Sequence, residues 1–314
     1  MKKVIVTGPT GVIGTALVRE LMEKDMEITA VCRHGSQRLC NLPVSNSVKV
    51  VECDLKDMSM LPMILKNDYD IFYHFAWAGT FGDSRNDMRI QLNNIQYTLD
   101  AVEAAYRLGC SRFIGAGSQA EYGPQERMIS SGTPAFPENG YGIAKLCAGQ
   151  MSRLRCEQLG MEHIWGRVLS VYGPYDGENT MIMMLIRNLL AGCKPSCTKG
   201  EQIWDYLYSK DASHAFYLLG ERGVPGKIYC IGSGNGRPLE VYINMIKDAI
   251  DSRLEIGLGD IPYKDGQVMY LCADISELSE DTGFQPAYTF EYGIAETIRW
   301  YKRKEREIMR DCME

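Results

Sequence analysis

Short apolar runs alternate with amphipathic stretches along the first half of the chain. The runs that predict strands cover residues 4–6, 27–32, 48–52, 70–77 and 112–117. Helical spacing predicts a helix over 15–24 and another between the last two strands, with its apolar face formed by Ile95, Leu99, Val102 and Ala105. This order favours an α/β fold with a doubly wound parallel sheet, whose ligands bind at the carboxyl ends of the strands.

A glycine-rich loop directly follows the first strand. The segment Thr7–Gly14 has glycines at positions 8, 11 and 14 and leads into the first helix. Glycines let the backbone approach a pyrophosphate, and the N-terminus of a helix directs N–H groups at it. An ordinary tight turn between a strand and a helix also uses glycine, but three glycines in this context predict a Rossmann-type dinucleotide-binding domain.

The alternation of strands and helices loosens after Gly173. The pattern predicts a helix from about Thr180 to Leu190, a strand over Ile228–Ile231 that returns to the main sheet, and an amphipathic helix over Phe290–Glu307. No linker rich in Pro or Ser marks a boundary, so we expect a smaller C-terminal α/β lobe that packs on the sheet. We assign residues 1–172, with the returning segment 224–246, to the dinucleotide-binding domain, and residues 173–223 and 247–314 to a substrate-binding lobe.

Composition narrows the classes of partner. The 314 residues are 45% hydrophobic and carry a net charge of -6, which predicts an ordered globular protein and argues against a nucleic-acid partner. The apolar run after the two N-terminal lysines is too short for a signal peptide, and no run is long enough to cross a membrane. We therefore expect a cytoplasmic protein with no membrane partner.

The 11 cysteines are scattered, as expected for buried apolar residues in a reducing compartment. Cys193 and Cys197 have a spacing known from metal sites, but no second pair of Cys or His lies near them in the sequence. We therefore expect no metal site.

The end of the second strand indicates which cofactor is bound. Arg33 follows this strand, and no acidic residue lies between Ala30 and Asn41. A carboxylate at this place usually binds the ribose of NAD, whereas an arginine accommodates the 2′-phosphate of NADP. We therefore favour NADP(H) over NAD(H), although an Arg33 side chain stacked on adenine would serve either cofactor.

Three residues indicate the chemistry. Tyr141 and Lys145 are four positions apart, so on a helix they share one face, and a lysine beside a tyrosine lowers the pKa of the phenol. Ser118 follows the fifth strand, where its hydroxyl can hold a carbonyl oxygen while the phenol gives or takes a proton. Such a set interconverts an alcohol and a ketone with a hydride carrier. Tyr206 and Lys210 have the same spacing, but no serine at a strand end precedes them.

Over nearly its whole length the chain resembles the extended short-chain dehydrogenase/reductase family, the NAD-dependent epimerase/dehydratase family, whose members mostly act on nucleotide-sugars. The resemblance rests on six landmarks in order. They are the loop Thr7–Gly14, His74-Phe75-Ala76, Asn94, the segment Ser118–Gly123, the pair Tyr141 and Lys145, and the segment Arg167–Pro174.

The resemblance implies a role for each landmark. Tyr141 would be the acid/base, Ser118 the donor that polarises the carbonyl, and Lys145 the ligand of the nicotinamide ribose; alternatively, the Ser118 hydroxyl only caps the strand end. The glycines would hold the pyrophosphate and Asp54 the adenine. The implied cofactor-binding set is Gly8, Thr10, Gly11, Val12, Ile13, Gly14, Arg33, Asp54, Leu55, Ala76, Trp77, Ala78, Asn94 and Lys145.

Three departures from the family pattern concern the substrate. Family dehydratases have an acid within two positions of the serine, where this chain has Gln119 and Ala120, so we expect no dehydratase. Trp204 stands where an arginine commonly binds the diphosphate, and it either stacks on the substrate or belongs to the core. Lys264 replaces a second phosphate-binding arginine. The candidate substrate-binding residues are Gln119, Ser170, Trp204 and Lys264.

The segment Gln267–Ile275 is similar to the corresponding part of CDP-abequose and CDP-paratose synthases, which reduce the 4-keto group of a CDP-deoxyhexose with NADPH. We therefore expect an NADPH-dependent 4-ketoreductase of a nucleotide-activated deoxysugar. An NAD-dependent nucleotide-sugar 4-epimerase and a non-catalytic dinucleotide-binding sensor are the alternatives. The resemblance also implies a homodimer formed through two helices of the sheet domain.

Overall fold

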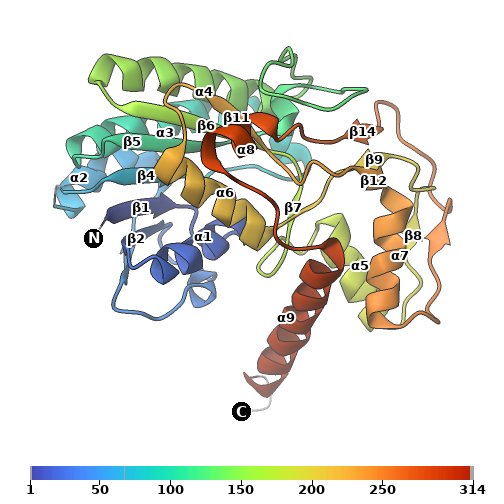
Figure 1. Cartoon of the computed structure of the whole chain (residues 1–314). Coiled ribbons are helices and arrows are strands. Elements are labelled where there is room, and N and C mark those ends of the chain that lie inside the picture. Colours follow the sequence, from blue (N-terminus) through green and yellow to red (C-terminus); the bar gives the residue numbers. More distant parts are fainter. Residues whose placement is uncertain (1, 67, 312–314) are drawn as a thin grey trace.

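A seven-stranded parallel sheet forms the centre of the structure (Figure 1). The computed structural model describes residues 2–66 and 68–311, with side chains described up to residue 307. The strands of this sheet are β1 (Lys3–Thr7), β2 (Glu27–Cys32), β3 (Val48–Glu52), β4 (Ile71–His74), β5 (Arg112–Ser118), β6 (Glu162–Val168) and β11 (Ile228–Ile231). Their order is β11-β6-β5-β4-β1-β2-β3, so the chain reverses its direction across the sheet between β1 and β4. Ligands of open α/β sheets bind at such a switch point.

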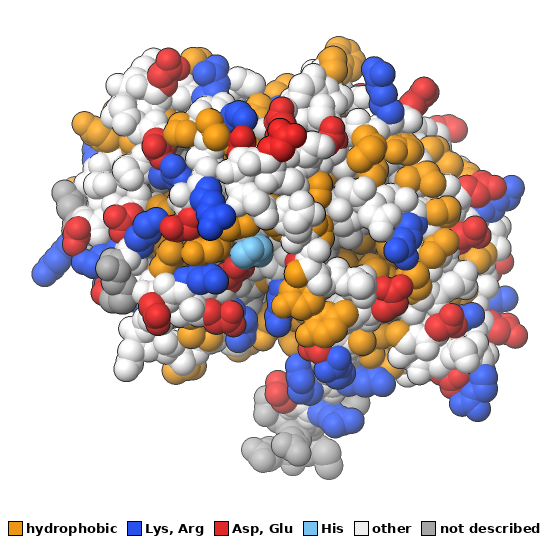
Figure 2. Space-filling view, viewed as in Figure 1, with side chains coloured by type: hydrophobic (Ala, Val, Ile, Leu, Met, Phe, Trp, Pro, Cys, Tyr) orange, Lys and Arg blue, Asp and Glu red, His pale blue; other side chains and the backbone are white. Residues whose placement is uncertain are grey.

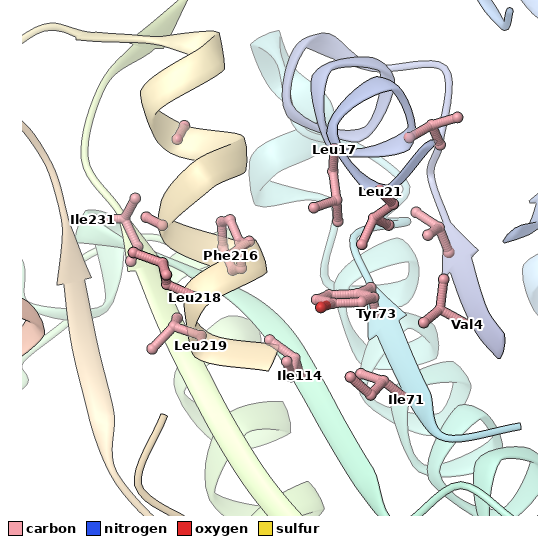
Figure 3. Packing of buried hydrophobic residues seen from close by; sticks show 14 of the residues in the cluster. Val4, Leu17, Leu21, Ile71, Tyr73, Ile114, Phe216, Leu218, Leu219 and Ile231 are labelled. Atoms are coloured by element: carbon pink, nitrogen blue, oxygen red, sulfur yellow. The ribbon is translucent and has the colours of Figure 1, made fainter. Parts of the chain in front are cut away.

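Helices cover both faces of the sheet (Figure 1). On one face α1 (Val12–Glu23) packs against α6 (Ser209–Arg222), and on the other α3 (Met88–Arg107) packs against α4 (Gly140–Leu159). Because side chains alternate along a strand, Val4 and Val6 belong to the core under α1 and α6, whereas Ile5 belongs to the core under α3. Figure 3 shows the first of these cores, in which Phe216 of α6 and Tyr73 of β4 fill the space between sheet and helices.

The structure confirms the predicted doubly wound sheet and corrects three details. The fourth strand ends at His74 instead of residue 77, because the N–H groups of Phe75 and Ala76 donate to the Thr7 hydroxyl and turn the chain away. The first helix begins at Val12, directly after the glycine loop. Ile95 and Leu99 are only half-buried, since α3 turns other side chains to the sheet. These buried residues of α3 are Gln91, Asn94, Thr98, Ala101, Val102, Ala104 and Ala105.

The second half of the chain adds a smaller group of elements around a third core. Its helices are α5 (Met181–Leu190), α7 (Leu239–Ile250) and α9 (Phe290–Asp311), which bury their apolar sides against one another. Two-residue strands form three small sheets: β7 (Val171–Tyr172) with β10 (Leu207–Tyr208), β12 (Arg237–Pro238) with β9 (Ile203–Trp204) and β14 (Tyr270–Leu271), and β13 (Gly257–Leu258) with β8 (Ser196–Cys197). The shorter helices are α2 (Leu61–Ile64), α8 (Ser276–Thr282), η1 (Leu39–Asn41), η2 (Leu55–Met60), η3 (Gly82–Asn86) and η4 (Gln119–Glu121).

Helix α6 packs on the large sheet, although the sequence analysis assigns residues 173–223 to the substrate-binding lobe. Its buried residues share a core with β1, β4 and α1. We therefore propose to count residues 209–222 with the sheet layer, and the remaining division into domain and lobe stays a prediction.

Positive and negative side chains are mixed over the face in Figure 2, where Lys and Arg gather near the far end of α9. This helix carries Lys302, Arg303, Lys304 and Arg306. Within the described part of the chain, no helix combines the length and the apolar character that a membrane crossing requires.

Candidate active site

A cavity of about 490 Å³ opens at the switch point of the sheet. It lies where the loops after β1, β2, β3 and β4 meet, which is the place predicted for a dinucleotide. Its lining consists of Thr7, Gly8, Pro9, Thr10, Gly11, Val31, Cys32, Arg33, Ser36, Arg38, Cys53, Asp54, Leu55, Met58, Phe75, Ala76, Trp77 and Ala78.

The glycine loop has the shape of a phosphate cradle. Gly8 has a φ of +67°, and a Cβ atom there would lie 2.8 Å from the Ala76 nitrogen. At Gly14 a Cβ atom would come closer to the Gly8 carbonyl oxygen than the 3.0 Å that real Cβ atoms keep. Gly11 has room for a Cβ atom, with its nearest neighbour at 3.7 Å. Gly8 and Gly14 thus bring helix and strand together, and the open side of the loop fits a pyrophosphate.

The cavity brings together most of the predicted cofactor-binding residues. Those that line it are Gly8, Thr10, Gly11, Arg33, Asp54, Leu55, Ala76, Trp77 and Ala78, whereas Val12, Ile13, Gly14, Asn94 and Lys145 lie outside the lining. Asn94 supports the lining without being part of it. Its side-chain amide accepts from the Ala78 N–H at 3.0 Å and donates to the Ala78 carbonyl at 2.9 Å. It therefore holds the wall of the cavity in place.

The far end of the cavity adds two residues, Ser36 and Arg38, to the predicted cofactor-binding set. Ser36 is buried in the lining, and Arg38 lines the cavity while donating to the Tyr175 carbonyl at 2.7 Å. Arg33 is exposed and lines the cavity without an ion pair in the described part of the chain. Asp54 accepts from the His34 N–H at 2.9 Å, so it ties the loop after β2 to the end of β3. Contacts between loops of different strands leave no signal in one sequence.

The catalytic candidates meet at the end of β5. Ser118 ends this strand and starts η4, and Tyr141 lies in the first turn of α4, which the Asn139 side chain caps by accepting from the Gly142 N–H at 2.9 Å. Gly142 lacks a Cβ atom where one would strike the Ala120 carbonyl, so α4 packs closely on η4. This packing places the Tyr141 phenol near enough to Ser118 for the Ser118 side chain to lower the pKa of the phenol.

The protonation of Tyr141 and Lys145 depends on burial. Burial raises the pKa of Tyr141, while the interaction with Ser118 and the charge of Arg85 lower it. Burial lowers the pKa of Lys145 to about 7, and the Glu121 carboxylate counteracts this shift. The Lys145 ammonium donates to the Ala116 carbonyl at 2.6 Å and lies 5.9 Å from the centre of the Tyr141 ring. Arg85 is one cation that lowers the tyrosine pKa, and the same effect expected of Lys145 stays a prediction.

Trp77 lines the cofactor cavity and contacts both Lys145 and Tyr141. The Lys145 nitrogen lies 3.7 Å from the centre of the indole ring, which also meets the Tyr141 ring edge-on. The indole N–H donates to the Gln91 side chain at 3.0 Å and fixes the ring. Cofactor atoms at Trp77 would therefore lie beside both catalytic side chains.

A buried ion pair lies behind Ser118. Glu121 is 0% exposed, and its carboxylate accepts from the Ser118 N–H at 2.8 Å, from Trp165 at 3.0 Å and from Arg167 at 2.5 Å. Arg167 also lies over the Tyr122 ring, 4.4 Å from its centre. The Glu121 carboxylate is therefore held by three donors and is not free to move protons.

The predicted substrate-binding residues are only partly brought together. Trp204 is half-buried in the C-terminal core, and its indole N–H donates to the Ser170 hydroxyl at 2.8 Å. Gln119 is half-buried in η4, next to Ser118. Lys264 is exposed in the loop between β13 and β14, and none of its described hydrogen bonds or ion pairs joins it to these residues. Arg237, which the sequence analysis did not single out, stands opposite Trp204 in the pairing of β12 with β9.

Two other sequence features have no role at this site. Tyr206 is surrounded by the rings of Tyr172, Tyr242 and Phe290, so it belongs to the core. Cys193 is exposed and donates only to a backbone carbonyl. Among the residues that the structure describes, no group of three or more His, Cys, Asp or Glu side chains is arranged to hold a metal ion.

Comparisons with known proteins agree with this geometry. The family described as "NAD dependent epimerase/dehydratase family" matches residues 4–232. A dTDP-glucose 4,6-dehydratase of Escherichia coli is 27% identical over 95% of this chain and 93% of its own length, and a dTDP-D-glucose 4,6-dehydratase of Mus musculus is 27% identical over 96% and 89%.

Solved structures share the whole fold. A UDP-N-acetylglucosamine 4-epimerase from Methanobrevibacter ruminantium M1, in complex with UDP-N-acetylmuramic acid, superposes with a TM-score of 0.87 at 25% identity and covers 96% of this chain and 99% of its own. A dTDP-glucose 4,6-dehydratase from Streptomyces venezuelae superposes with a TM-score of 0.85 at 22% identity, over 96% and 97%. The latter likeness concerns the fold alone.

Proposed function

Because the chain belongs to the NAD dependent epimerase/dehydratase family of enzymes, we propose that it reduces the 4-keto group of a nucleotide-activated deoxysugar with NADPH. The observation that carries this proposal is the proximity of Ser118 and Tyr141 next to Trp77, which lines the cavity and also contacts Lys145. From this place the two hydroxyls can bind the oxygen of a substrate carbonyl whose carbon would lie next to the bound nicotinamide.

Each residue has one task in the reaction. A bound nicotinamide supplies the hydride that forms the new C–H bond at C4 of the sugar. As the carbonyl electrons move to the oxygen, the Tyr141 phenol gives it a proton, and Ser118 donates a hydrogen bond to the same oxygen. Solvent then returns a proton to the Tyr141 phenolate. Lys145 would bind the nicotinamide ribose after leaving the Ala116 carbonyl.

The residues next to Ser118 argue against dehydration of the sugar, although the curated relatives above are named as 4,6-dehydratases. Removing water from a sugar needs a group that moves protons near the substrate. Gln119 and Ala120 do not ionise, and the Glu121 carboxylate is buried and bound by three donors. The chain thus retains the groups for hydride transfer without an acid for elimination.

The preference for NADPH rests on Arg33. This side chain lines the cavity at the carboxyl end of β2, and a guanidinium there binds a 2′-phosphate. On the neighbouring strand, the Glu52 carboxylate accepts from the Gly35 N–H at 3.3 Å and lies outside the lining, while Asp54, which lines the cavity, accepts from the His34 N–H. A carboxylate facing the ribose would have favoured NAD.

A second candidate function is 4-epimerisation of a nucleotide-sugar with a retained NAD. The likeness to the 4-epimerase structure at 25% identity favours it. An epimerase uses the same three residues, since Tyr141 first takes the proton of the C4 hydroxyl and later returns it after the ketosugar has rotated. The two functions differ in whether the nicotinamide leaves the protein.

The experiment that tests the proposal is a cofactor analysis. The freshly purified protein is denatured, any released nicotinamide is identified, and the emptied protein is titrated with NADPH and NADH. An empty site with tighter binding of NADPH supports the reductase, whereas stoichiometric bound NAD supports the epimerase and contradicts the role of Arg33.

A variant tests the chemistry. Tyr141→Phe is expected to keep its affinity for NADPH and to lose several orders of magnitude in turnover of 4-keto deoxysugar nucleotides, since the phenol supplies the proton. A variant that retains most of the rate contradicts the assignment. Absence of turnover in the unaltered protein, together with ligand-dependent binding to another protein, indicates a sensor.

A further inference from the structure

An arginine from an irregular loop lies on the catalytic tyrosine. Arg85 belongs to η3, between β4 and α3. The centre of its guanidinium lies 4.3 Å from the centre of the Tyr141 ring, and its Nη1 atom donates to the Thr80 carbonyl at 3.2 Å. Arg85 is half-buried and makes no ion pair with any described carboxylate.

The loop that carries Arg85 is held in place from two sides. The Asn86 side chain accepts from the Gly140 N–H at 2.9 Å, which joins η3 to the first residue of α4. On the other side Gln91 of α3 donates to the Ser84 and Gly79 carbonyls, each at 2.9 Å. Hydrogen bonds to the residues directly before and after Arg85 therefore hold its backbone in place next to Tyr141.

We propose that Arg85 is a positioning residue for the acid/base reaction of Tyr141: its guanidinium holds the ring and favours the ionised phenol. The inference rests on the proposed role of Tyr141 in hydride transfer. A guanidinium over an aromatic face is attracted by the ring, and the attraction grows when the ring carries a negative charge. The direction agrees with the pKa of Tyr141, which the charge of Arg85 lowers.

The other charges around Tyr141 do not replace Arg85. On η4 the Glu121 carboxylate raises the pKa of Tyr141, and on β6 the charge of Arg167 is paired with Glu121. On α4 itself the Lys145 nitrogen lies farther from the ring, at 5.9 Å, and donates to a carbonyl on β5.

Further charged groups lie on α4 and on the elements near it. Asp83 in η3 is exposed, and Asp87 caps α3 through the backbone N–H groups of residues 89 and 90. The pair Arg155 and Glu103, between the far ends of α4 and α3, lies about four helical turns from Tyr141. Arg85 is thus the cation seated on the phenol ring.

The test measures the ionisation of Tyr141 directly. The protein is labelled with 3,5-difluorotyrosine, whose phenol titrates at lower pH than tyrosine, and the ¹⁹F signal of position 141 is assigned with Tyr141→Phe. Titrations are recorded with and without NADPH for the unaltered protein, Arg85→Gln, Arg85→Lys and the control Arg89→Gln. Arg89 is an exposed arginine four residues away, outside the site.

We expect the titration of position 141 to move to higher pH in Arg85→Gln and to stay unchanged in Arg89→Gln. Arg85→Lys is expected to fall between them, because lysine keeps the charge without the planar stack. For oxidation of the alcohol product, kcat of Arg85→Gln is expected to fall about fivefold below the titration midpoint, with KM nearly unchanged.

An unchanged titration in folded Arg85→Gln overturns the inference, as does an effect confined to KM. A titration that moves as expected in a protein without sugar turnover supports the inference and contradicts only the proposed function. The two failures are therefore distinguishable.

Discussion

The buried ion pair behind Ser118 gives a prediction whose size follows from the structure. In Glu121→Gln, the side chain keeps its shape but loses its charge and one acceptor oxygen. It then presents an amide NH₂ group to donors that the carboxylate now satisfies, namely Ser118, Trp165 and Arg167. At 3% exposure Arg167 gains little from solvent in return.

Breaking a buried pair on one side costs about 3–5 kcal/mol, because the remaining charge is left without compensation. Exposed pairs contribute about 0–1 kcal/mol, so the position of the pair decides the size of the effect. For a chain of 314 residues this loss lowers the melting temperature by about 5–8 °C, given an unfolding entropy of about 2.1 cal/mol/K per residue. The loss is a large part of the stability of an ordinary protein.

The assay is thermal unfolding of Glu121→Gln, followed by circular dichroism at one protein concentration without cofactor. Glu157→Gln is the matched control, since Glu157 pairs with Arg153 at 3.7 Å on the surface of α4 and is expected to change the melting temperature by less than about 1.5 °C. Equal effects of the two variants would refute the reasoning. A double variant with Glu121→Leu and Arg167→Met is expected to recover part of the loss, since replacing both charges removes the uncompensated one.

Two further changes have defined outcomes. Gly14→Ala is expected to lower the free energy of unfolding in urea by about 1–3 kcal/mol in the absence of cofactor, because the new Cβ would strike the Gly8 carbonyl. Gly11 has room for a Cβ atom, so Gly11→Ala is expected to change this free energy by less than about 0.5 kcal/mol. If the protein is the expected homodimer, Met151→Lys should give monomers in light scattering after size exclusion. Met151 and Leu154 form part of an exposed apolar stripe on α4, and an unchanged mass would contradict this interface.

The strands of the large sheet were predictable because their apolar runs are short and glycine or charged residues separate them. Residues 27–32 form a strand within the predicted bounds, since buried parallel strands carry continuous apolar sequences. Residues 48–52 also match, although this edge strand is mostly exposed, because its three valines favour an extended backbone. The glycine loop was equally predictable, because glycines at this spacing mark positions where the backbone comes close to a neighbouring segment or to a ligand. Strand β6 was not predicted, and only the motif that begins at its Arg167 was recognised.

The small sheets and the substrate side were not predictable to the same degree. A two-residue strand such as β9 has no period, so its pairing of Trp204 with Arg237 cannot be read from the sequence. In the structure the Trp204 indole donates a hydrogen bond to the Ser170 hydroxyl, whereas Lys264 is exposed in a loop. The diphosphate contact expected of these residues stays a prediction, and Arg237 deserves inclusion in its test.

The charges around Tyr141 come from segments without regular spacing, and their balance explains why Glu121 is compatible with catalysis. A buried carboxylate near the phenol opposes its ionisation, and burial of Tyr141 acts in the same direction. Arg167 forms an ion pair with Glu121 and so offsets its charge, and Arg85 adds a positive charge over the Tyr141 ring. Loss of Arg167 would therefore act on the phenol as well as on stability, since an unpaired Glu121 would raise the pKa of Tyr141 further. Such coupling predicts that Arg167 variants shift the titration of Tyr141 in the same direction as Arg85→Gln, although Arg167 does not touch the tyrosine.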